Sequence, residues 1–272
     1  MAFWDTIHWG DAPKRKEQLD EYIDYTGVAA FGRKKVSASE KINTVANHFN
    51  RVASKYDLMN SILSMGLQHV WKRTSVRMMN IQAGDRIIDV CGGTGDLAVL
   101  AARQAGPSGF VSIYDFNRAM MNAGRDKFRP GTSAPITCIQ GDAECIAFPD
   151  NTFDGAMVGF GIRNVTHLKK GFSEMHRVLR PGGKIMCLDF SKPTNAFFRS
   201  LYDFYSFNVM PFLGGLIFGS AQSYACLSET IRIFPLPDEL ARILETIGFD
   251  QVKYKRMTNG IAVIHIGVKS GG

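Results

Sequence analysis

A glycine-rich turn between two apolar segments is the feature that most constrains this chain. Residues 87–91 (Ile-Ile-Asp-Val-Cys) suit a buried strand, and residues 97–105 follow a helical apolar pattern. Between them stand Gly92, Gly93 and Gly95. Because glycine tolerates positive φ and has no Cβ, such a turn lets a ligand lie against backbone N–H groups at the start of a helix. The stretch therefore predicts a cofactor site.

The composition is that of a globular enzyme. The chain has 272 residues, of which 45% are hydrophobic and 21% are charged, so it can bury a large core. We expect residues 1–30 to be an extension whose role is not readable, and residues 31–272 to form a single domain. The net charge of +7 and the pI near 9.2 favour an anionic partner such as nucleic acid or a membrane surface, but they fit an ordinary basic protein equally well.

Targeting and cysteine patterns narrow the setting. The first 25 residues are charged, and no 18-residue apolar stretch occurs, so we expect neither a signal peptide nor a membrane span. Five cysteines without a C-x-x-C pair predict neither a zinc site nor a disulfide framework. These features predict a cytoplasmic protein that at most touches the inner face of the membrane.

Strand and helix patterns alternate after the glycine turn. Strands are predicted at 86–91, 110–114, 136–140, 156–158 and 184–188, with helices at 97–105, 119–128 and 168–179. A last helix at 237–247 precedes strands at 251–257 and 261–268, which suit a terminal hairpin. Such alternation predicts an α/β fold with parallel strands, right-handed crossovers and a ligand beyond the strands' carboxyl ends.

Two further segments flank this core. A helix starting near Ser39, followed by residues 52–60 and 64–73, predicts a helical cover over the cofactor loop. Residues 194–232 form an apolar, aromatic insertion that Arg199, Asp203 and Pro211 interrupt. This insertion fits an apolar lid or interfacial helix and equally a helix packed onto the sheet.

The cofactor is chosen by the acidic residues at the strand ends. Residues 93–98 match G-x-G-x-x-A, so a nicotinamide cofactor has to be considered, and Asp115 suits the ribose of either candidate. Asp96 would repel a pyrophosphate, whereas S-adenosylmethionine has no phosphate and carries two cationic groups. The cluster Asp142-Ala143-Glu144 can reach an adenine, and the turn at 177–183 is typical of class I methyltransferases. S-adenosylmethionine is favoured, although Asp89 could simply anchor loop amides and Glu144 could be a solvated charge.

Several motifs together carry a family resemblance. They stand at residues 54–60 (Ser-Lys-Tyr-Asp-Leu-Met-Asn), 92–96, 148–154, 160–165 (Phe-Gly-Ile-Arg-Asn-Val), 177–183 and 190–193. From about residue 28 onwards the chain resembles the ubiquinone/menaquinone biosynthesis C-methyltransferases. The resemblance implies a seven-stranded class I methyltransferase sheet, mostly parallel and Rossmann-like, with an antiparallel C-terminal strand and helices on both faces. It also implies methyl transfer to a ring carbon of a polyprenylated benzoquinol or naphthoquinol.

The resemblance also assigns the cofactor contacts. It implies contacts from Thr94, Asp115 and the pair Asp142–Ala143, and we expect the loop and its neighbours to complete the site with Tyr56, Asp89, Gly92, Gly93 and Gly159. The chain departs from the usual family pattern at three places: Asp142 replaces an asparagine, Gly159 replaces a serine, and Gln68-His69 replaces a His-Arg pair. The change at Gly159 removes a side-chain contact to the cofactor.

Carbon methylation defines what the catalytic residues must do. The acceptor must be the reduced quinol, whose hydroxyl has a pKa of about 10, so the site must assist deprotonation. Arg163 is the first candidate to stabilise the phenolate, with Asn164 positioning the quinol oxygen and Asp142 accepting the proton through water. The structural alternative is Arg163 in a salt bridge and Asn164 at a turn. Fallback bases are His69, His167 and His176, and no metal is needed.

The acceptor side and the partners follow from the same argument. We expect residues 197–218, with Tyr202, Tyr205 and Tyr224, to form an apolar groove for the isoprenoid tail. The expected partners are the quinol and, transiently, a membrane surface, with no nucleic acid; the oligomeric state is open between a monomer and a homodimer. Alternative functions are a methyltransferase for nucleic acid or another small molecule, and a non-catalytic S-adenosylmethionine-binding subunit of a quinone-synthesis complex.

Overall fold

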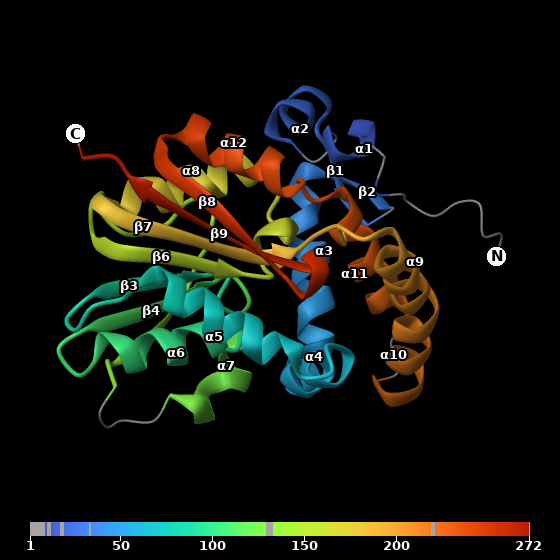
Figure 1. The fold of residues 1–272 in the computed structure, drawn as a ribbon, viewed down its shortest axis with the longest axis horizontal. Coiled ribbons are helices and arrows are strands. Elements are labelled where there is room, and N and C mark those ends of the chain that lie inside the picture. Colours follow the sequence, from blue (N-terminus) through green and yellow to red (C-terminus); the bar gives the residue numbers. More distant parts are fainter. Residues whose placement is uncertain are drawn as a thin grey trace.

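The computed structural model (Figure 1) describes residues 9, 12–16, 19–32, 34–128, 133–218 and 221–271. The side chains of residues 12, 14, 217, 218 and 221–225 lie outside this description.

A seven-stranded sheet with the order β5-β4-β3-β6-β7-β9-β8 forms the centre of the molecule (Figure 1). The strands are β3 (Arg86–Val90), β4 (Phe110–Asp115), β5 (Ile136–Gln140), β6 (Phe153–Gly159), β7 (Leu179–Phe190), β8 (Phe249–Met257) and β9 (Ala262–Lys269). Every pair is parallel except those made by β9, the last strand of the chain, which is antiparallel to β7 and β8. The predicted mostly parallel sheet with an antiparallel C-terminal strand is confirmed.

The alternation of side chains along β3 builds a core on each face. Ile88 and Val90 pack with α8 (Leu168–Val178) and α12 (Pro237–Ile247), whereas Ile87 packs with α5 (Leu67–Met79) and α6 (Asp96–Ala105). Successive strand residues point to opposite faces, and every residue of β3 after Arg86 is buried. Helices therefore cover both faces, as Figure 1 shows.

Two strands begin three or more residues before their predicted starts. β6 begins at Phe153 rather than residue 156, and β7 begins at Leu179, so the Arg-Pro-Gly-Gly segment lies within the strand. Phe153 pairs with Leu179, after which the register shifts before Gly155 pairs with Lys184. The proline and the two glycines predict a turn from sequence, but in the structure they lie in the part of β7 where the register with β6 shifts.

The predicted helical cover consists of α3 (Ala38–Val52), a short 3-10 turn, α4 (Tyr56–Leu63) and α5. Before it, α1 (Ala12–Lys16) and α2 (Asp20–Thr26) precede a hairpin of β1 (Val28–Phe31) and β2 (Lys34–Ser37) that was not predicted. The hairpin spans the expected division at residue 30. That division stays a prediction.

The apolar insertion packs on the helical cover instead of lying flat on the sheet. It comprises α9 (Ala196–Phe204), a π-helical turn (Tyr205–Val209), α10 (Met210–Phe218) and α11 (Ala221–Ile233). Met210 packs with Met59 and Leu63 of α4, and the Tyr205 hydroxyl donates to the Leu63 carbonyl at 2.7 Å. The insertion thereby forms a wall facing the helical cover. Within the described ranges no helix is long and apolar enough to cross a membrane.

An N-terminal residue helps to hold this insertion. The Trp9 indole donates to Asp203 at 2.9 Å, and the buried Arg232 guanidinium lies over the Trp9 ring and donates to Asp203 at 2.5 Å. Arg232 also donates to Ser206 and to the Ser228 carbonyl. The early part of the chain is therefore packed against the insertion.

Candidate active site

The glycine turn takes the strand-to-helix geometry expected for a cofactor loop. β3 ends at Val90, the backbone has positive φ at Cys91, Gly93 and Gly95, and α6 begins at Asp96. A Cβ on Gly92 would stand 2.9 Å from the Asp89 Cγ, so a side chain there would collide with the strand. The turn therefore needs both the backbone freedom and the small size of glycine.

Asp89 ties the strand to the helix that follows it. Its Oδ2 accepts from the Ala98 amide at 3.1 Å, while its Oδ1 has no hydrogen-bond partner among the described residues. Burial raises the pKa of Asp89 to about 8. Asp89 thus anchors the start of α6, which agrees with the interpretation that it holds backbone amides. It also lines the cofactor cavity.

Asp115 stands at the end of β4 and holds the glycine turn. Its two oxygens accept from the amides of Gly93 (2.8 Å) and Asn117 (2.7 Å). Burial raises the pKa of Asp115 to about 6, and the two amide donors act against this rise. At pH 7 the ionised carboxylate is therefore a hydrogen-bond acceptor directed into the cavity that it lines.

The acidic cluster after β5 divides into two roles. Asp142 and the buried Ala143 line the cavity, and the Asp142 carboxylate accepts from the Glu144 amide at 2.9 Å. Glu144 accepts from the amides of Thr166 and His167 and contacts the His167 ring at 2.7 Å. It therefore binds the start of α8 and is not a merely solvated charge.

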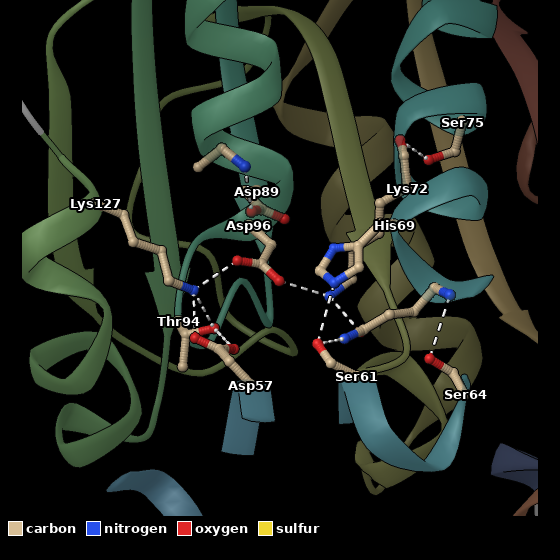
Figure 2. A network of polar contacts seen from close by, with 12 residues as sticks. Asp57, Ser61, Ser64, His69, Lys72, Ser75, Asp89, Thr94, Asp96 and Lys127 are labelled. Carbon is tan, nitrogen blue, oxygen red and sulfur yellow. Dashed lines mark hydrogen bonds and ion pairs between the residues drawn. The ribbon is translucent and has the colours of Figure 1, made fainter. Parts of the chain in front are cut away.

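A polar network joins the glycine turn to the helical cover (Figure 2). Thr94 donates its hydroxyl to Asp57 of α4 at 2.6 Å, and the Lys127 ammonium reaches Thr94 (3.1 Å), Asp57 (2.5 Å) and Asp96 (2.5 Å). Lys72 of α5 donates to the other Asp96 oxygen at 2.8 Å. Burial acts to raise the pKa of Asp96, but the charges of Lys72 and Lys127 outweigh it and lower that pKa to about 2.

These elements enclose a cofactor cavity of about 970 Å³, part of it open to solvent. The predicted cofactor residues all line it: Tyr56, Asp89, Gly92, Gly93, Thr94, Asp115, Asp142, Ala143 and Gly159. Its carboxyl groups, the glycine turn that lines it and the unpartnered Asp89 Oδ1 fit a ligand with a ribose and cationic groups. A Cβ on Gly159 would stand 2.5 Å from the Leu97 Cδ1, so the missing side chain is replaced by a close approach of Leu97.

A second, mainly apolar cavity of about 1780 Å³, also partly open to solvent, lies between the helical cover and the insertion. Its lining includes Met59, Leu63 and Trp71 from the cover and Leu201 and Met210 from the insertion. Four residues line both cavities and form their shared wall: Phe49, Tyr56, Phe160 and Asn164. A group bound in the apolar cavity can therefore approach a group bound in the cofactor cavity.

Arg163 lies in the apolar cavity, paired with a buried aspartate that sequence reasoning missed. Its guanidinium donates to the Asp189 Oδ1 at 2.8 Å and lies over the Phe190 ring at 5.5 Å. Burial raises the pKa of Asp189, and the Arg163 charge acts against the rise. The Arg163 Nε and the Asp189 Oδ2 have no partner in the described part of the chain. Both atoms are buried, and Arg163 lines the apolar cavity whereas Asp189 lines neither cavity.

The other predicted catalytic and substrate-binding residues are divided between the cofactor cavity and the apolar cavity. Asn164 lies in the shared wall, whereas Asp142 lines the cofactor cavity and not the apolar one. Tyr202 and Tyr205 line the apolar cavity, and the side chain of Tyr224 lies outside the described residues. His69, His167 and His176 instead bond to Ser61, Glu144 and the Gly248 carbonyl. The roles of all these residues stay predictions.

The histidine in the apolar cavity is one that the sequence reasoning passed over. His48 of α3 packs edge-on against Phe31 and Phe49, and burial lowers its pKa, which favours the neutral ring at pH 7. Its position three residues after the buried Val45 could have placed it on the inner side of the helix. For Asp189 the signal was an acidic residue at the end of a strand, the pattern used for Asp115.

The sheet order, the turn after β3 and the acidic strand ends define a class I S-adenosylmethionine-dependent methyltransferase. A family model for the ubiE/COQ5 methyltransferase family matches residues 34–269. The chain belongs to this family.

Curated relatives agree. Proteins named ubiquinone/menaquinone biosynthesis C-methyltransferase UbiE from Pseudomonas fluorescens strain SBW25 and Stutzerimonas stutzeri are 45% and 44% identical to it over 240 residues, which is 88% of this chain and 94% of each relative. The chain is thus similar to these enzymes over nearly their full length.

Solved structures support the fold alone. The [4+2]-cyclase SpnF aligns with a TM-score of 0.61 at 16% identity, covering 84% of this chain and 96% of that one. A methyltransferase from Thermotoga maritima aligns with a TM-score of 0.58 at 16% identity, covering 82% and 99%. Because one of these is called a cyclase, the fold does not by itself fix the reaction.

Ligand affinity should depend on the ionisation of Asp115. We expect the ionised carboxylate to accept hydrogen bonds from the ribose hydroxyls, so that binding is lost as pH falls through the pKa of about 6. With only a tenth of the carboxyl ionised one pH unit below its pKa, we expect the affinity for S-adenosylhomocysteine to fall by about tenfold from pH 7 to pH 5. Isothermal titration calorimetry measures this.

The matched variants are Asp115→Asn and Asp142→Asn, both in the same cavity. Asp115→Asn should bind more weakly at pH 7 and lose the pH dependence, whereas Asp142→Asn should keep it. If the S-adenosylhomocysteine affinity of Asp115→Asn depends on pH as that of the wild type does, the group that titrates is not Asp115.

Proposed function

We propose that this protein transfers a methyl group from S-adenosylmethionine to a ring carbon of a reduced, polyprenylated quinol in menaquinone or ubiquinone biosynthesis. The observation that carries the proposal is an apolar cavity sharing the wall of Phe49, Tyr56, Phe160 and Asn164 with the cofactor cavity. The names of the two relatives point to the same reaction. When bound, S-adenosylmethionine supplies the electrophilic methyl group.

The apolar cavity suits a hydrophobic aromatic acceptor better than a nucleic acid. Among the described residues that line it, the basic ones are Arg163 and His48, and aromatic and aliphatic side chains make up most of the rest. Phosphate recognition uses several Lys or Arg side chains. This lining supports a quinol with an isoprenoid tail, and no nucleic acid partner.

In this proposal Arg163 lowers the cost of forming a phenolate. A phenol has a pKa of about 10, and a fixed guanidinium in a poorly hydrated cavity stabilises the negative oxygen. Asp189 holds the guanidinium at 2.8 Å and leaves the Arg163 Nε unpartnered. Asn164, in the shared wall, would position the quinol oxygen.

Three groups are candidates to take the phenol proton. Asp142, the predicted acceptor, stands on the cofactor side and would act through water. Asp189 is paired with Arg163, and its raised pKa makes its carboxylate a better base. His48 lies in the apolar cavity itself and is favoured in its neutral form.

The surroundings of the apolar cavity suit a tail drawn from a membrane. Five large apolar side chains of α9 and α10 are exposed, and one of them, Leu201, also lines the apolar cavity; the five are Phe197, Leu201, Phe204, Phe212 and Leu216. Such a patch, together with a net charge of +7, favours contact with an anionic membrane surface. We therefore propose a cytoplasmic protein that touches the membrane to collect its substrate.

Methyl transfer tests the proposal directly. With labelled S-adenosylmethionine, we expect label in a demethylated benzoquinol or naphthoquinol under reducing conditions and none in the oxidised quinone, because the quinone ring is electrophilic. Mass spectrometry of the product identifies the methylated ring carbon. Labelling of RNA but not of quinol would show a different methyltransferase, and no transfer to any acceptor would favour a non-catalytic subunit.

Arg163→Ala should reduce kcat by about 10²–10³, as loss of one preorganised donor to a developing oxyanion does. S-adenosylhomocysteine affinity should stay within about threefold, because Arg163 does not line the cofactor cavity. Calorimetry measures the S-adenosylhomocysteine affinity, and single-turnover assays measure the rate of methyl transfer.

The control is Asp189→Asn, which keeps the guanidinium but removes its ionic partner. Thermal unfolding of both variants reports whether losing half of this buried pair unfolds the protein. We expect a smaller loss of kcat in Asp189→Asn. Near-normal turnover in a folded Arg163→Ala protein would remove Arg163 from the mechanism.

Leu201→Asp should weaken binding of long-tailed quinols while leaving short-tailed ones unchanged. Leu201 lines the apolar cavity, and burying an aliphatic side chain against a tail contributes about 1.5–3 kcal/mol, so KM for the long-tailed substrate should rise at least tenfold. Assays in detergent measure KM for the long-tailed and the short-tailed quinol.

Leu216→Asp is the matched variant on the exposed surface of α10, outside the apolar cavity. It should leave both KM values in detergent unchanged and weaken binding to anionic vesicles. If long and short tails give equal specificity constants in the wild type, the tail site is wrong.

A further inference from the structure

The charges around the cofactor cavity are strongly unequal. Five carboxyl groups line the cavity, from Asp89, Asp96, Asp115, Asp142 and Glu144, and that of Asp89, with a pKa of about 8, is mostly neutral at pH 7. Among the described residues of its lining, Lys72 is the one cationic side chain. A ligand that fits this cavity must place its positive groups near the acids and any negative group near Lys72.

S-adenosylmethionine carries both kinds of charge. Its sulfonium and ammonium groups are cationic, and its methionine end has a carboxylate. The nucleoside end is expected at Asp115 and Asp142, at the ends of β4 and β5. The methionine end would then follow the turn past Gly93 towards Thr94 and Lys72, on the side of the cavity next to α5.

Lys72 is held ready to donate to such a carboxylate. It is only 8% exposed, and its ammonium donates to the Gln68 Oε1 at 2.9 Å and to the Asp96 Oδ2 at 2.8 Å. An ammonium has three N–H donors, so these contacts leave one for an anion in the cavity. Two partners on different elements fix the side chain before a ligand arrives.

The charge of Lys72 is not cancelled by Asp96. Asp96 also accepts from Lys127 at 2.5 Å through its other oxygen, so one carboxylate is shared by two ammonium groups (Figure 2). Lys127 contacts Asp57 and Thr94 as well and does not line the cavity. Lys72 is thus the member of this network that a cofactor can reach.

We propose that Lys72 binds the methionine carboxylate of S-adenosylmethionine and thereby selects a cofactor with an intact amino-acid end. The inference rests on the use of S-adenosylmethionine and not on the identity of the methyl acceptor. It assigns Lys72 a binding role and leaves the quinol chemistry untouched. Its two direct partners, Gln68 and Asp96, hold the ammonium in place.

The test compares two ligands that differ by the carboxylate: S-adenosylmethionine and decarboxylated S-adenosylmethionine. In the wild type we expect calorimetry to show tighter binding of the carboxylate-bearing ligand by about 10–100-fold, as for a hydrogen bond between charged groups. In Lys72→Met this preference should shrink to within about threefold, with the affinity for the decarboxylated ligand nearly unchanged.

The control is Lys127→Met, which loses a contact with the same Asp96 but lies outside the cavity. It should change both affinities by the same factor. Equal weakening of both ligands in Lys72→Met would overturn the proposal, and so would a wild type that does not prefer the carboxylate-bearing ligand, a result that needs no variant to fold. Failure to methylate quinols would leave this comparison unaffected.

Discussion

The hydrogen bond from the Gly93 amide to the Asp115 carboxylate is the contact on which the rest of the site depends. It ties the turn after β3 to the end of β4, which are neighbours in the sheet. A buried carboxylate is costly unless backbone donors surround it, and here the amides of Gly93 and Asn117 supply them. The glycine turn thus stabilises the charged form of Asp115, which we expect to bind a ribose. The Asp115 carboxylate in return fixes the conformation of the glycine turn.

Much of the fold could be predicted because the spacing of apolar residues along the sequence indicates each strand and helix. The strand at 86–91 and the helix at 97–105 match β3 and α6 almost residue for residue, since buried strands and amphipathic helices have distinct patterns. The convergence of the strand-end residues that line the cofactor cavity followed from one topological rule: parallel strands gather their carboxyl ends at one edge. Asp115 and Asp142 could therefore be placed together without coordinates.

What could not be predicted depends on contacts distant in sequence. The hairpin of β1 and β2 has weak strand patterns and forms only by pairing. The pairing of Arg163 with Asp189 joins residues 26 positions apart, and the contact of Lys72 with Asp96 joins two helices. Periodicity gives the face on which such side chains lie but not their partner. The apolar insertion was ambiguous because a lid and a packed helix have the same composition.

The shared wall of Phe49, Tyr56, Phe160 and Asn164 separates two solvent environments as well as two cavities. On one side the acidic cavity admits a charged reactant that dissolves only in water; on the other, the apolar cavity admits one that, on the proposed function, dissolves only in lipid. Phe160, at the end of β6, stands in this wall with a left-handed backbone. The protein would then bring together, across this shared wall, two reactants that have no common solvent.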